Sequence, residues 1–401
     1  MEIVFDIFNY VLVAIMIGVS GAWIALIRSM IITFQKSPFL DKFSAKQHLN
    51  PKVSVILPAR NEEKFIKKCL DSLLNQDYEN YEIMAIDDSS EDSTGKIIEE
   101  YSKKDSKIIF VRARKKPEGW MGKNWACMEG FRKSSGELFL FTDSDTVHSK
   151  NVISLAVSHL FSEKLDVLTV SPRMRCLDGW TKITLPMIST FLHTRFSALR
   201  VNDPNKKTGY FFGSFFIIKK KVYESVGMHE GVKHEIIEDG ALGKKVKESG
   251  FKMKMVRGDH LIDAVWARDV SSLWHAIKRL MVPLYLQNKG YAVGIFFAVL
   301  FLLFMPFPLL AYSGVFFNEG NSFVFLFIVS IISCILLYTA AFIETKILYL
   351  KYSNAVLCPI GSFIVVFGFL SGILQAKSNA AVSWRGRSYS MKEYVQDSIQ
   401  V

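Results

Sequence analysis

The chain has 401 residues, 50% hydrophobic and 22% charged, and its 49 Lys and Arg against 38 Asp and Glu give a formal net charge of +11. This length suits two or three domains, and the hydrophobic content excludes both a small disulfide scaffold and a disordered chain. The five cysteines form no CxxC pair and the eight histidines show no metal-ligand spacing, so we expect reduced thiols and no zinc site. The positive charge fits nucleic acid, a membrane surface or an anionic substrate equally well, and the apolar segments described below favour the last two over nucleic acid.

The first apolar segment lies near the start of the chain. Between Val4 and Ile27 the only charged residue is Asp6, and a helix needs about 20 apolar residues to cross a bilayer. Acidic residues precede this segment, whereas Arg28 and Lys36 follow it, and positive charge favours the cytoplasmic side. We therefore predict a transmembrane anchor over residues 1–28 rather than a cleaved signal peptide, with the next domain in the cytoplasm.

Residues 51–279 alternate short apolar strands with amphipathic helices. The hydrophobic periodicity predicts strands at 53–57, 81–86, 108–111 and 137–142, and helices at 65–76 and 94–103. This alternation predicts an α/β domain with a mostly parallel, Rossmann-like sheet. Ligands bind beyond the carboxyl ends of the strands in such sheets, and the polar clusters of this chain fall there. Neither GxGxxG nor GxxxxGK[ST] occurs, which argues against a dinucleotide fingerprint and a Walker loop.

Acidic motifs stand where glycine-rich loops would otherwise be expected. Asp87 and Asp88 close the second strand, residues 143–145 (DSD) follow a later strand, and Glu238 and Asp239 come further on. Two aspartates separated by one residue can share a divalent cation, and their oxygen ligands suit Mg²⁺ or Mn²⁺. A cation held there can neutralise a diphosphate leaving group. Taken alone, an Asp-x-Asp triplet is more often a turn.

Four segments resemble, in order and spacing, the motifs of the inverting glycosyltransferases of family 2, which have a GT-A nucleotide-sugar domain: residues 53–62 (VSVILPARNE), 87–90 (DDSS), 143–145 (DSD) and 238–239 (ED). The resemblance covers residues 51–279. With the apolar segments and residues 384–389 (WRGRSY), the chain is most similar to membrane enzymes that glycosylate lipids. The carotenoid-acid and hopanoid-associated branch is nearer than ceramide glucosyltransferase.

The resemblance implies a nucleotide-sugar site in the first half of this domain. The loop containing Pro58, Ala59, Arg60 and Glu62 would surround the nucleoside. Asp88 would accept a hydrogen bond from the ring N–H of the base, usually uracil, which a carboxylate can do and a lysine cannot. Outside the family context, Asp88 is a turn or helix-cap residue and Arg60 a surface cation.

The resemblance also implies which residues handle the diphosphate and the acceptor. Lys123, near a predicted helix start, would approach the donor phosphates, and Asp143 and Asp145 would bind them through Mg²⁺ or Mn²⁺, with Asp145 the more direct ligand. Asp239 would be the catalytic base that takes the proton of the acceptor hydroxyl. Without the resemblance, Glu238 and Asp239 are simply acids that favour a helix start.

The chain departs from the family pattern before its last apolar segments. Processive synthases carry Gln-x-x-Arg-Trp there, whereas no tryptophan follows Arg279, which weakens a polymer-synthase interpretation. Arg279, His275, Glu238, Trp384 and Arg385 remain candidates for contacts with the acceptor or the diphosphate. An interfacial anchor at Arg279 and a basic membrane-surface patch in the tail are the alternatives.

Two further stretches rich in aromatic residues interrupt the domain. Residues 185–199 are too short and too charged to span a membrane, and they suggest an interfacial helix or a wall that faces the acceptor. Residues 209–216 (GYFFGSFF) are predicted to form a buried strand with glycines at close approaches.

Three apolar runs follow, at 291–315, 322–343 and 355–374, each long enough to span. If all three cross, the basic tail at 377–401 lies outside, which contradicts the preference of positive charge for the cytoplasm. We therefore expect one run of the membrane region 280–376 to be re-entrant. The last run is the first candidate, because Pro359 and its glycines could break it.

The sequence thus predicts a multi-pass protein of the cell membrane with a cytoplasmic glycosyltransferase domain. It would transfer one sugar from a nucleotide-sugar donor to a lipid hydroxyl or carboxyl, and a UDP-sugar is the first candidate for the donor. A polyisoprenyl-phosphate sugar synthase, a short-polysaccharide synthase and a non-catalytic membrane scaffold of the same fold are the alternatives.

Overall fold

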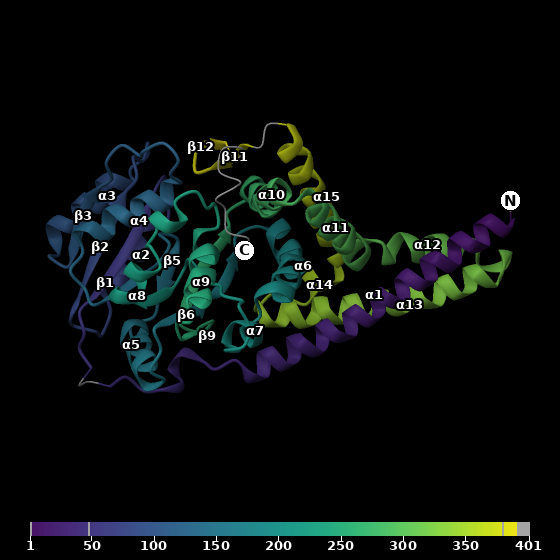
Figure 1. Ribbon diagram of the computed structural model, residues 1–401, viewed down its shortest axis with the longest axis horizontal. Coiled ribbons are helices and arrows are strands. Elements are labelled where there is room, and N and C mark those ends of the chain that lie inside the picture. The colour runs from purple at the N-terminus through teal and green to yellow at the C-terminus, as the bar shows by residue number, and fades with distance from the viewer. Residues whose placement is uncertain (1, 47–48, 379–380, 391–401) are drawn as a thin grey trace.

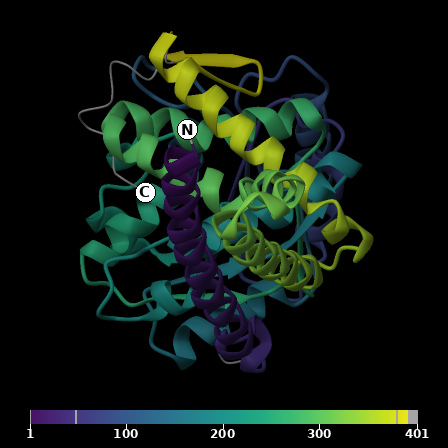
Figure 2. The same ribbon diagram turned by 90° about the vertical axis from the view of Figure 1, so that its right-hand side faces the viewer.

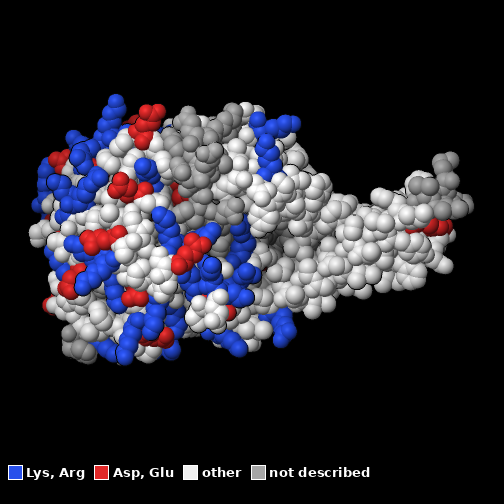
Figure 3. Space-filling model, viewed as in Figure 1, with Lys and Arg blue, Asp and Glu red and all other residues white. Residues whose placement is uncertain are grey.

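The computed structural model describes residues 2–46, 49–378 and 381–390. The chain forms a globular α/β part and a long arm of apolar helices, with the N-terminus at the free end of the arm (Figure 1). Lys and Arg side chains cover the globular part, while the visible face of the arm is almost bare of charge until acidic residues appear near its tip (Figure 3).

A seven-stranded sheet in the order β3-β2-β1-β4-β8-β6-β9 forms the centre of the globular part. Only β8 runs antiparallel to its neighbours, which confirms the predicted mostly parallel α/β sheet. The strands are β1 (Val53–Ala59), β2 (Tyr81–Asp87), β3 (Ile108–Arg112), β4 (Leu138–Phe141), β6 (Val167–Ser171), β8 (Phe216–Lys219) and β9 (Met253–Arg257). A second sheet has the order β5-β10-β7, with β5 (Thr146–His148), β10 (Ile262–Ala267) and β7 (Arg173–Cys176).

Helices cover both faces of the large sheet. Every residue of β1 and β2 is buried, as expected for parallel strands that pack on both sides. Alternate side chains of β1 point into two separate hydrophobic cores, one on each face of the sheet. Val55 belongs to the first core, with side chains of α2 (Ile66–Leu74), α3 (Thr94–Lys104) and α5 (Val152–Ser162). Ile56 belongs to the second core, with side chains of α4 (Gly122–Lys133) and α9 (Glu238–Glu248). The short α8 (Lys220–Ser225) adds to the second core.

The arm consists of α1 (Glu2–Lys36), α12 (Pro306–Val315) and α13 (Asn321–Ile347), which pack side by side. Within the described residues, α1, α13 and α15 (Cys358–Ser378) are long and apolar enough to cross a membrane. A bent pair, made of residues 289–304 and α12, forms a fourth candidate with an angle of 57° between its halves. The first half contains α11 (Lys289–Val299) and the π-helical turn Leu300–Phe304.

The last apolar run, 355–374, is interrupted only near its start, where α14 (Ser353–Val356) ends and α15 begins at Cys358. α15 is one continuous helix, and the bend lies in the first run, where the π-helical turn meets Pro306. The glycines of α15 permit close packing instead: a Cβ at Gly361 would lie 2.2 Å from the carbonyl oxygen of Ile183, and one at Gly368 would lie 2.5 Å from Ile277. α15 therefore packs on α6 (Gly179–Phe196) and α10 (Val270–Gln287) and runs across the arm rather than along it (Figures 1 and 2).

The predicted strand at 209–216 is wrong. Only Phe216 belongs to a strand, and residues 209–215 form a loop that packs directly on α9. A Cβ at Gly209 would lie 2.0 Å from the carbonyl oxygen of Gly243, so this close approach replaces strand pairing. The helix predicted within 185–199 is present as the second half of α6, followed by α7 (Ala198–Asn202).

Arg257 joins the globular part to the arm. Its guanidinium lies 4.0 Å from the ring centre of Phe34 and 4.4 Å from that of Phe39, and it donates to the backbone oxygen of Phe34. Its backbone N–H donates to the oxygen of Pro38 at 2.8 Å. These contacts fix the end of α1 against β9.

Candidate active site

A cavity of about 320 Å³ lies beyond the carboxyl ends of β1, β2 and β4. Two further elements border it: α10, and the hairpin formed by β11 (Ala381–Trp384) and β12 (Arg387–Ser390). Twelve of the sequence-predicted residues line the cavity: Pro58, Ala59, Arg60, Glu62, Asp88, Lys123, Asp143, Asp145, Glu238, Asp239, Arg279 and Arg385. His275 lies on α10 but does not line it, and the side chain of Trp384 lies outside the described part of the chain.

One group of side chains gathers around Lys123, at the start of α4. The Lys123 Nζ lies 2.7 Å from Asp143 Oδ1 and 2.6 Å from Glu238 Oε1. Asp239 is fixed beside them, because its Oδ2 accepts from the backbone N–H of Gly213 and its Oδ1 accepts from that of Gly240, each at 2.8 Å. The loop 209–215 thus supplies the N–H that orients the predicted base.

The electrostatics of this group are unbalanced, with three carboxylates around one ammonium. Burial together with the neighbouring Glu238 raises the pKa of Asp239 to about 7, against the opposing charge of Lys123. Burial alone would lower the pKa of Lys123, but Asp143, Glu238 and Asp239 hold that pKa well above its ordinary value. Lys123 is therefore a permanent cation, whereas Asp239 can exchange a proton near neutral pH.

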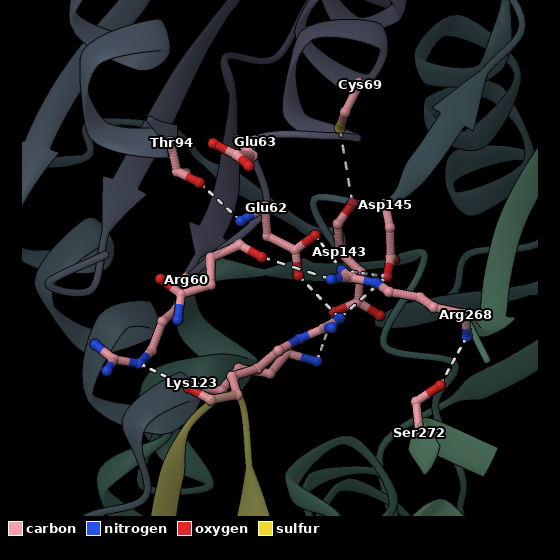
Figure 4. A network of polar contacts seen from close by, with 12 residues as sticks. Arg60, Glu62, Glu63, Cys69, Thr94, Lys123, Asp143, Asp145, Arg268 and Ser272 are labelled. Atoms are coloured by element: carbon pink, nitrogen blue, oxygen red, sulfur yellow. Dashed lines mark hydrogen bonds and ion pairs between the residues drawn. The ribbon is translucent and has the colours of Figure 1, made fainter. Parts of the chain in front are cut away.

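A second group surrounds Asp145 at the end of the DSD motif (Figure 4). Its Oδ2 lies 3.4 Å from Arg268 Nη2 and 3.3 Å from Arg385 Nη2. The same two guanidinium groups pair with Glu62, in the case of Arg385 at 2.9 Å. Burial raises the pKa of Glu62 to about 7, although both arginines oppose the shift.

The opposite end of the cavity is formed by Asp88 and the tail hairpin. Arg387 Nη1 lies 2.5 Å from Asp88 Oδ2, and the Tyr389 hydroxyl accepts from the backbone N–H of Gly122 at 3.2 Å. Burial raises the pKa of Asp88 even with Arg387 beside it.

Arg60 forms its hydrogen bonds with the surrounding loops rather than pointing into the open cavity. It donates to the backbone oxygens of Asp88, Ser89 and Arg385, and it pairs with Glu91. Ser89 and Arg385 both have positive φ angles, of 56° and 48°, which are strained for these residue types. Arg60 therefore holds two unusual turns in place, one after β2 and one at the tip of the tail hairpin.

The carboxylates suit a divalent cation. Burial and the neighbouring Asp143 raise the pKa of Asp145, and the two nearby arginines oppose this shift. Asp143 and Asp145 offer the oxygen ligands that Mg²⁺ and Mn²⁺ prefer. Among the described residues no group of three or more His, Cys, Asp or Glu could hold a metal by itself. The remaining ligands would have to come from outside the protein, as a diphosphate and water can provide.

Sequence reasoning missed Arg268 and Gly213. Arg268 follows β10 as a lone arginine with no motif around it, and only the fold brings it to Glu62 and Asp145. Gly213 lies in the stretch predicted to be a strand. A Cβ there would come within 2.9 Å of both Asp239 Oδ2 and Lys123 Nζ, so a larger residue would displace these two groups. The motif at 384–389 was recognised from the sequence, but its packing against Asp88 was not predicted.

A family model described as "Glycosyl transferase family 2" matches residues 54–227. The 4,4'-diaponeurosporenoate glycosyltransferase of Staphylococcus aureus is 25% identical over 250 residues, which cover 59% of this chain and 64% of that protein. The glycosyltransferase GlyA of Streptococcus pneumoniae is 29% identical over 119 residues, which cover 30% of this chain and 16% of that protein. The chain thus spans less than two thirds of the length of either relative.

A solved structure shares the fold over nearly the whole chain. The mannosyltransferase PcManGT from Pyrobaculum calidifontis, determined in complex with GDP-Man and Mn²⁺, superposes with a TM-score of 0.51 at 15% identity. The match covers 92% of this chain and 99% of that one. The mostly parallel sheet and its flanking helices are therefore those of a GT-A domain, as predicted.

Proposed function

Because residues 54–227 form a glycosyltransferase family 2 domain, as the sequence motifs indicated, we propose that the protein is an inverting glycosyltransferase. It moves one sugar from a nucleotide-sugar donor to a membrane lipid. The observation that carries this proposal is a single cavity that holds Asp88 at one end and the Asp143, Asp145 and Asp239 carboxylates at the other.

Asp239 is the catalytic base in this proposal. Its carboxylate is held by the N–H groups of Gly213 and Gly240, and its pKa of about 7 suits proton uptake at neutral pH. The acceptor oxygen attacks the anomeric carbon from the face opposite the diphosphate while Asp239 takes its proton. The C–O bond to the acceptor forms as the C–O bond to the diphosphate breaks, so one displacement inverts the anomeric centre without a covalent enzyme intermediate.

The leaving diphosphate needs positive charge. Lys123, Arg268 and Arg385 face the cavity or its carboxylates, and Arg279 lines the wall with no hydrogen bond or ion pair to any described residue. Asp143 and Asp145 would hold Mg²⁺ or Mn²⁺, which when bound neutralises charge on the diphosphate. Glu238 positions Lys123 through their contact at 2.6 Å.

The nucleoside lies at the other end of the cavity. Pro58 and Ala59 at the end of β1 form the wall beside the nucleoside. Asp88 accepts a hydrogen bond from the ring N–H of the base, for which uracil is the first candidate. Arg60 and Glu62 support this end indirectly, since both are engaged with neighbouring loops and arginines.

The membrane arrangement follows from the arm. We propose that α1, the bent pair at 289–315 and α13 cross the bilayer, with the tip of the arm outside and the catalytic domain in the cytoplasm. Arg28, Lys36 and Lys42 then lie on the cytoplasmic side. α15 lies at the interface and exposes Ile360, Phe363 and Phe367, with exposed fractions of 43%, 49% and 51%. The basic tail thereby stays cytoplasmic, where Arg385 and Arg387 reach the cavity.

A polyisoprenyl-phosphate sugar synthase and a short-polysaccharide synthase use the same fold and chemistry. A scaffold that keeps the fold without turnover is the alternative of another class. It has no need for a carboxylate with a pKa near 7 beside a buried lysine, and this favours the enzyme.

The test is sugar transfer by the purified full-length protein in detergent with total membrane lipid. Radiolabelled UDP-glucose, UDP-galactose, UDP-N-acetylglucosamine and GDP-mannose are supplied with Mn²⁺, with Mg²⁺ or with EDTA. We expect label from one donor in the organic phase, lost with EDTA and lost in Asp145→Asn. Asp166→Asn, whose carboxylate pairs with Lys219 and does not line the cavity, is the control. Equal label with Asp145→Asn and wild type, or none from any donor, refutes the proposal.

A further inference from the structure

A second cavity, of about 200 Å³, lies next to the candidate active site. Three helices form its walls: the end of α1, the second half of α6 and the end of α13. Met174, Leu192, Tyr210, Phe212 and Trp266 line both cavities, so the two spaces share one wall of side chains. The second cavity therefore borders directly on the cavity that Asp239 lines.

The position of this cavity indicates an amphiphile. It lies where α1 and α13, two of the membrane-spanning candidates, end against the globular part (Figure 1). Apolar surface comes from Met30 and Phe34 on α1, from Leu185 and Phe196 on α6, and from Ile347 and Leu348 at the end of α13. This is the depth at which a lipid changes from hydrocarbon to head group.

Buried polar atoms in the same walls lack partners within the described structure. The hydroxyl oxygens of Thr33 and Ser37 and the Oδ1 of Asp259 are buried without a hydrogen bond. Glu344, only 2% exposed, accepts from Ser189 through its Oε2 at 2.7 Å. Buried polar groups are rarely left unpaired, so these atoms point to a ligand with hydrogen-bonding groups.

The charges around the cavity disfavour an anionic ligand. Its two cationic side chains are already paired, Arg257 with Asp259 at 2.8 Å and Arg173 with Asp263 at 2.6 Å. The remaining charged group of the lining is Glu344. His193, which contacts Ser29, stays neutral because burial lowers its pKa to about 4. A carboxylate or phosphate would thus meet carboxylate oxygens and no unpaired cation.

The reacting group is constrained independently by Asp239. A lipid carboxylate needs no base to attack an anomeric carbon, whereas a hydroxyl must lose its proton. The Asp239 carboxylate, which the N–H groups of Gly213 and Gly240 hold in the neighbouring cavity, can take that proton, and this favours a hydroxyl acceptor.

We propose that the second cavity is the acceptor site and that the acceptor is an uncharged lipid with a free hydroxyl, not a lipid acid or lipid phosphate. This inference rests on the proposed glycosyltransferase function and specifies its substrate class. The hydrocarbon lies against α6 and the end of α13, Glu344 accepts from the polar end, and the reacting hydroxyl passes Trp266 toward Asp239.

Photo-crosslinking tests the site without any turnover. Hexadecanol, hexadecanoic acid and hexadecyl phosphate, each with the same diazirine in the chain, are irradiated with the full-length protein at pH 8. Mass spectrometry then maps the labelled residues. We expect hexadecanol to label the α6 and α13 walls about tenfold more than the two anionic probes, because like charges repel across a desolvated site.

Matched variants make the test specific. Thr33→Phe fills the cavity and breaks no hydrogen bond, because the Thr33 hydroxyl has no partner, and it should reduce hexadecanol labelling about tenfold. Ile31→Phe, on the same helix but 41% exposed and outside the lining, is the control and should label as wild type. Glu344→Gln keeps an acceptor for Ser189, and it should raise labelling by the acid toward that by the alcohol.

The outcomes separate this inference from the proposed function. Labelling outside the cavity, equal labelling by the three probes, or equal labelling of Thr33→Phe and Ile31→Phe overturns the acceptor site. If the cavity is labelled as expected but no donor transfers sugar to hexadecanol or to total lipid, the lipid site stands and the glycosyltransferase function fails.

Discussion

Arg387 and Asp88 lie 299 residues apart in the sequence, yet the guanidinium of Arg387 donates to both carboxylate oxygens of Asp88, at 2.5 Å and 3.1 Å. The pair joins the tail hairpin to the end of β2. The side chain of Asp88 is 4% exposed and that of Arg387 is 20% exposed, so the pair is shielded from solvent. The tail hairpin is thus a wall of the cavity at the end where Asp88 lies.

The first prediction concerns this pair. Arg387→Met should loosen the hairpin, because a charge-assisted hydrogen-bonded pair contributes about 2 kcal/mol, or roughly 30-fold in an opening equilibrium. Hydrogen–deuterium exchange over β11 and β12 measures the change. Ser388→Ala, at an exposed position of the same strand, should exchange as wild type. Unchanged exchange in Arg387→Met would show that other contacts hold the hairpin.

The second prediction concerns the base. Asp239→Asn cannot take up the acceptor proton, so kcat should fall about 10²- to 10⁴-fold. The Kd of the donor, measured by titration calorimetry, should change little, since Asp239 acts on the acceptor. Glu248→Gln, at the far end of α9, is the control. A variant that keeps more than a tenth of the wild-type kcat would remove Asp239 from the mechanism.

The third prediction concerns pH. The pKa of Asp239 is raised to about 7 by burial and by Glu238, and only the ionised carboxylate is a base. The value of kcat/KM should therefore be low at pH 5.5, rise through about pH 7 and level off above it. Rates at fixed ionic strength, with unfolding monitored in parallel, provide the measurement. A flat profile between pH 5.5 and pH 8 contradicts the assignment.

The fourth prediction concerns Gly213. A methyl group there would meet Asp239 Oδ2 and Lys123 Nζ at 2.9 Å and Asp143 Oδ2 at 3.3 Å. Gly213→Ala should therefore displace these groups and lower kcat/KM at least about tenfold, since misplacement on the scale of 1 Å costs about 10²-fold. Gly179→Ala meets nothing within 4 Å and should behave as wild type. Both kinetics and melting temperature should be recorded, because an inactive but unfolded variant would not test the site.

The fifth prediction concerns topology. Asn318→Cys, at the tip of the arm, should react with a membrane-impermeant maleimide in intact cells. Ser378→Cys, at the end of α15, should react only after permeabilisation. Both positions are exposed, whereas the five native cysteines are buried or partly buried. Labelling of Ser378→Cys in intact cells would place the tail outside and contradict its docking on the catalytic domain.

Local sequence patterns predicted the strands of the sheet and the helices that cover it. β2 and β4 are apolar runs followed by aspartates, so the sequence alone indicates that Asp88, Asp143 and Asp145 lie beyond one edge of the sheet. The bounds shifted by only a residue or two, for example from 94–103 to Thr94–Lys104 in α3.

Local sequence patterns could not predict the contacts between segments that lie far apart in the sequence. The glycines of α15 suggested a broken helix, but their purpose depends on Ile183 and Ile277, which lie far away in the sequence. The aromatic stretch at 209–216 has the composition of a strand, yet its glycines fit against α9 and around Asp239. Arg268 has no distinguishing neighbours at all, and its role emerges only when β10 ends beside Glu62.

The clamp of Arg257 between Phe34 and Phe39 has a kinetic consequence. It fixes β9 of the globular part to the end of α1, so in the proposed membrane arrangement the second cavity would keep a constant height above the bilayer. A lipid acceptor would then arrive by two-dimensional diffusion, while the sugar donor would arrive from bulk solution. Reaction velocity should accordingly follow the mole fraction of acceptor in the surface, and adding inert lipid at constant total acceptor should slow the enzyme by surface dilution.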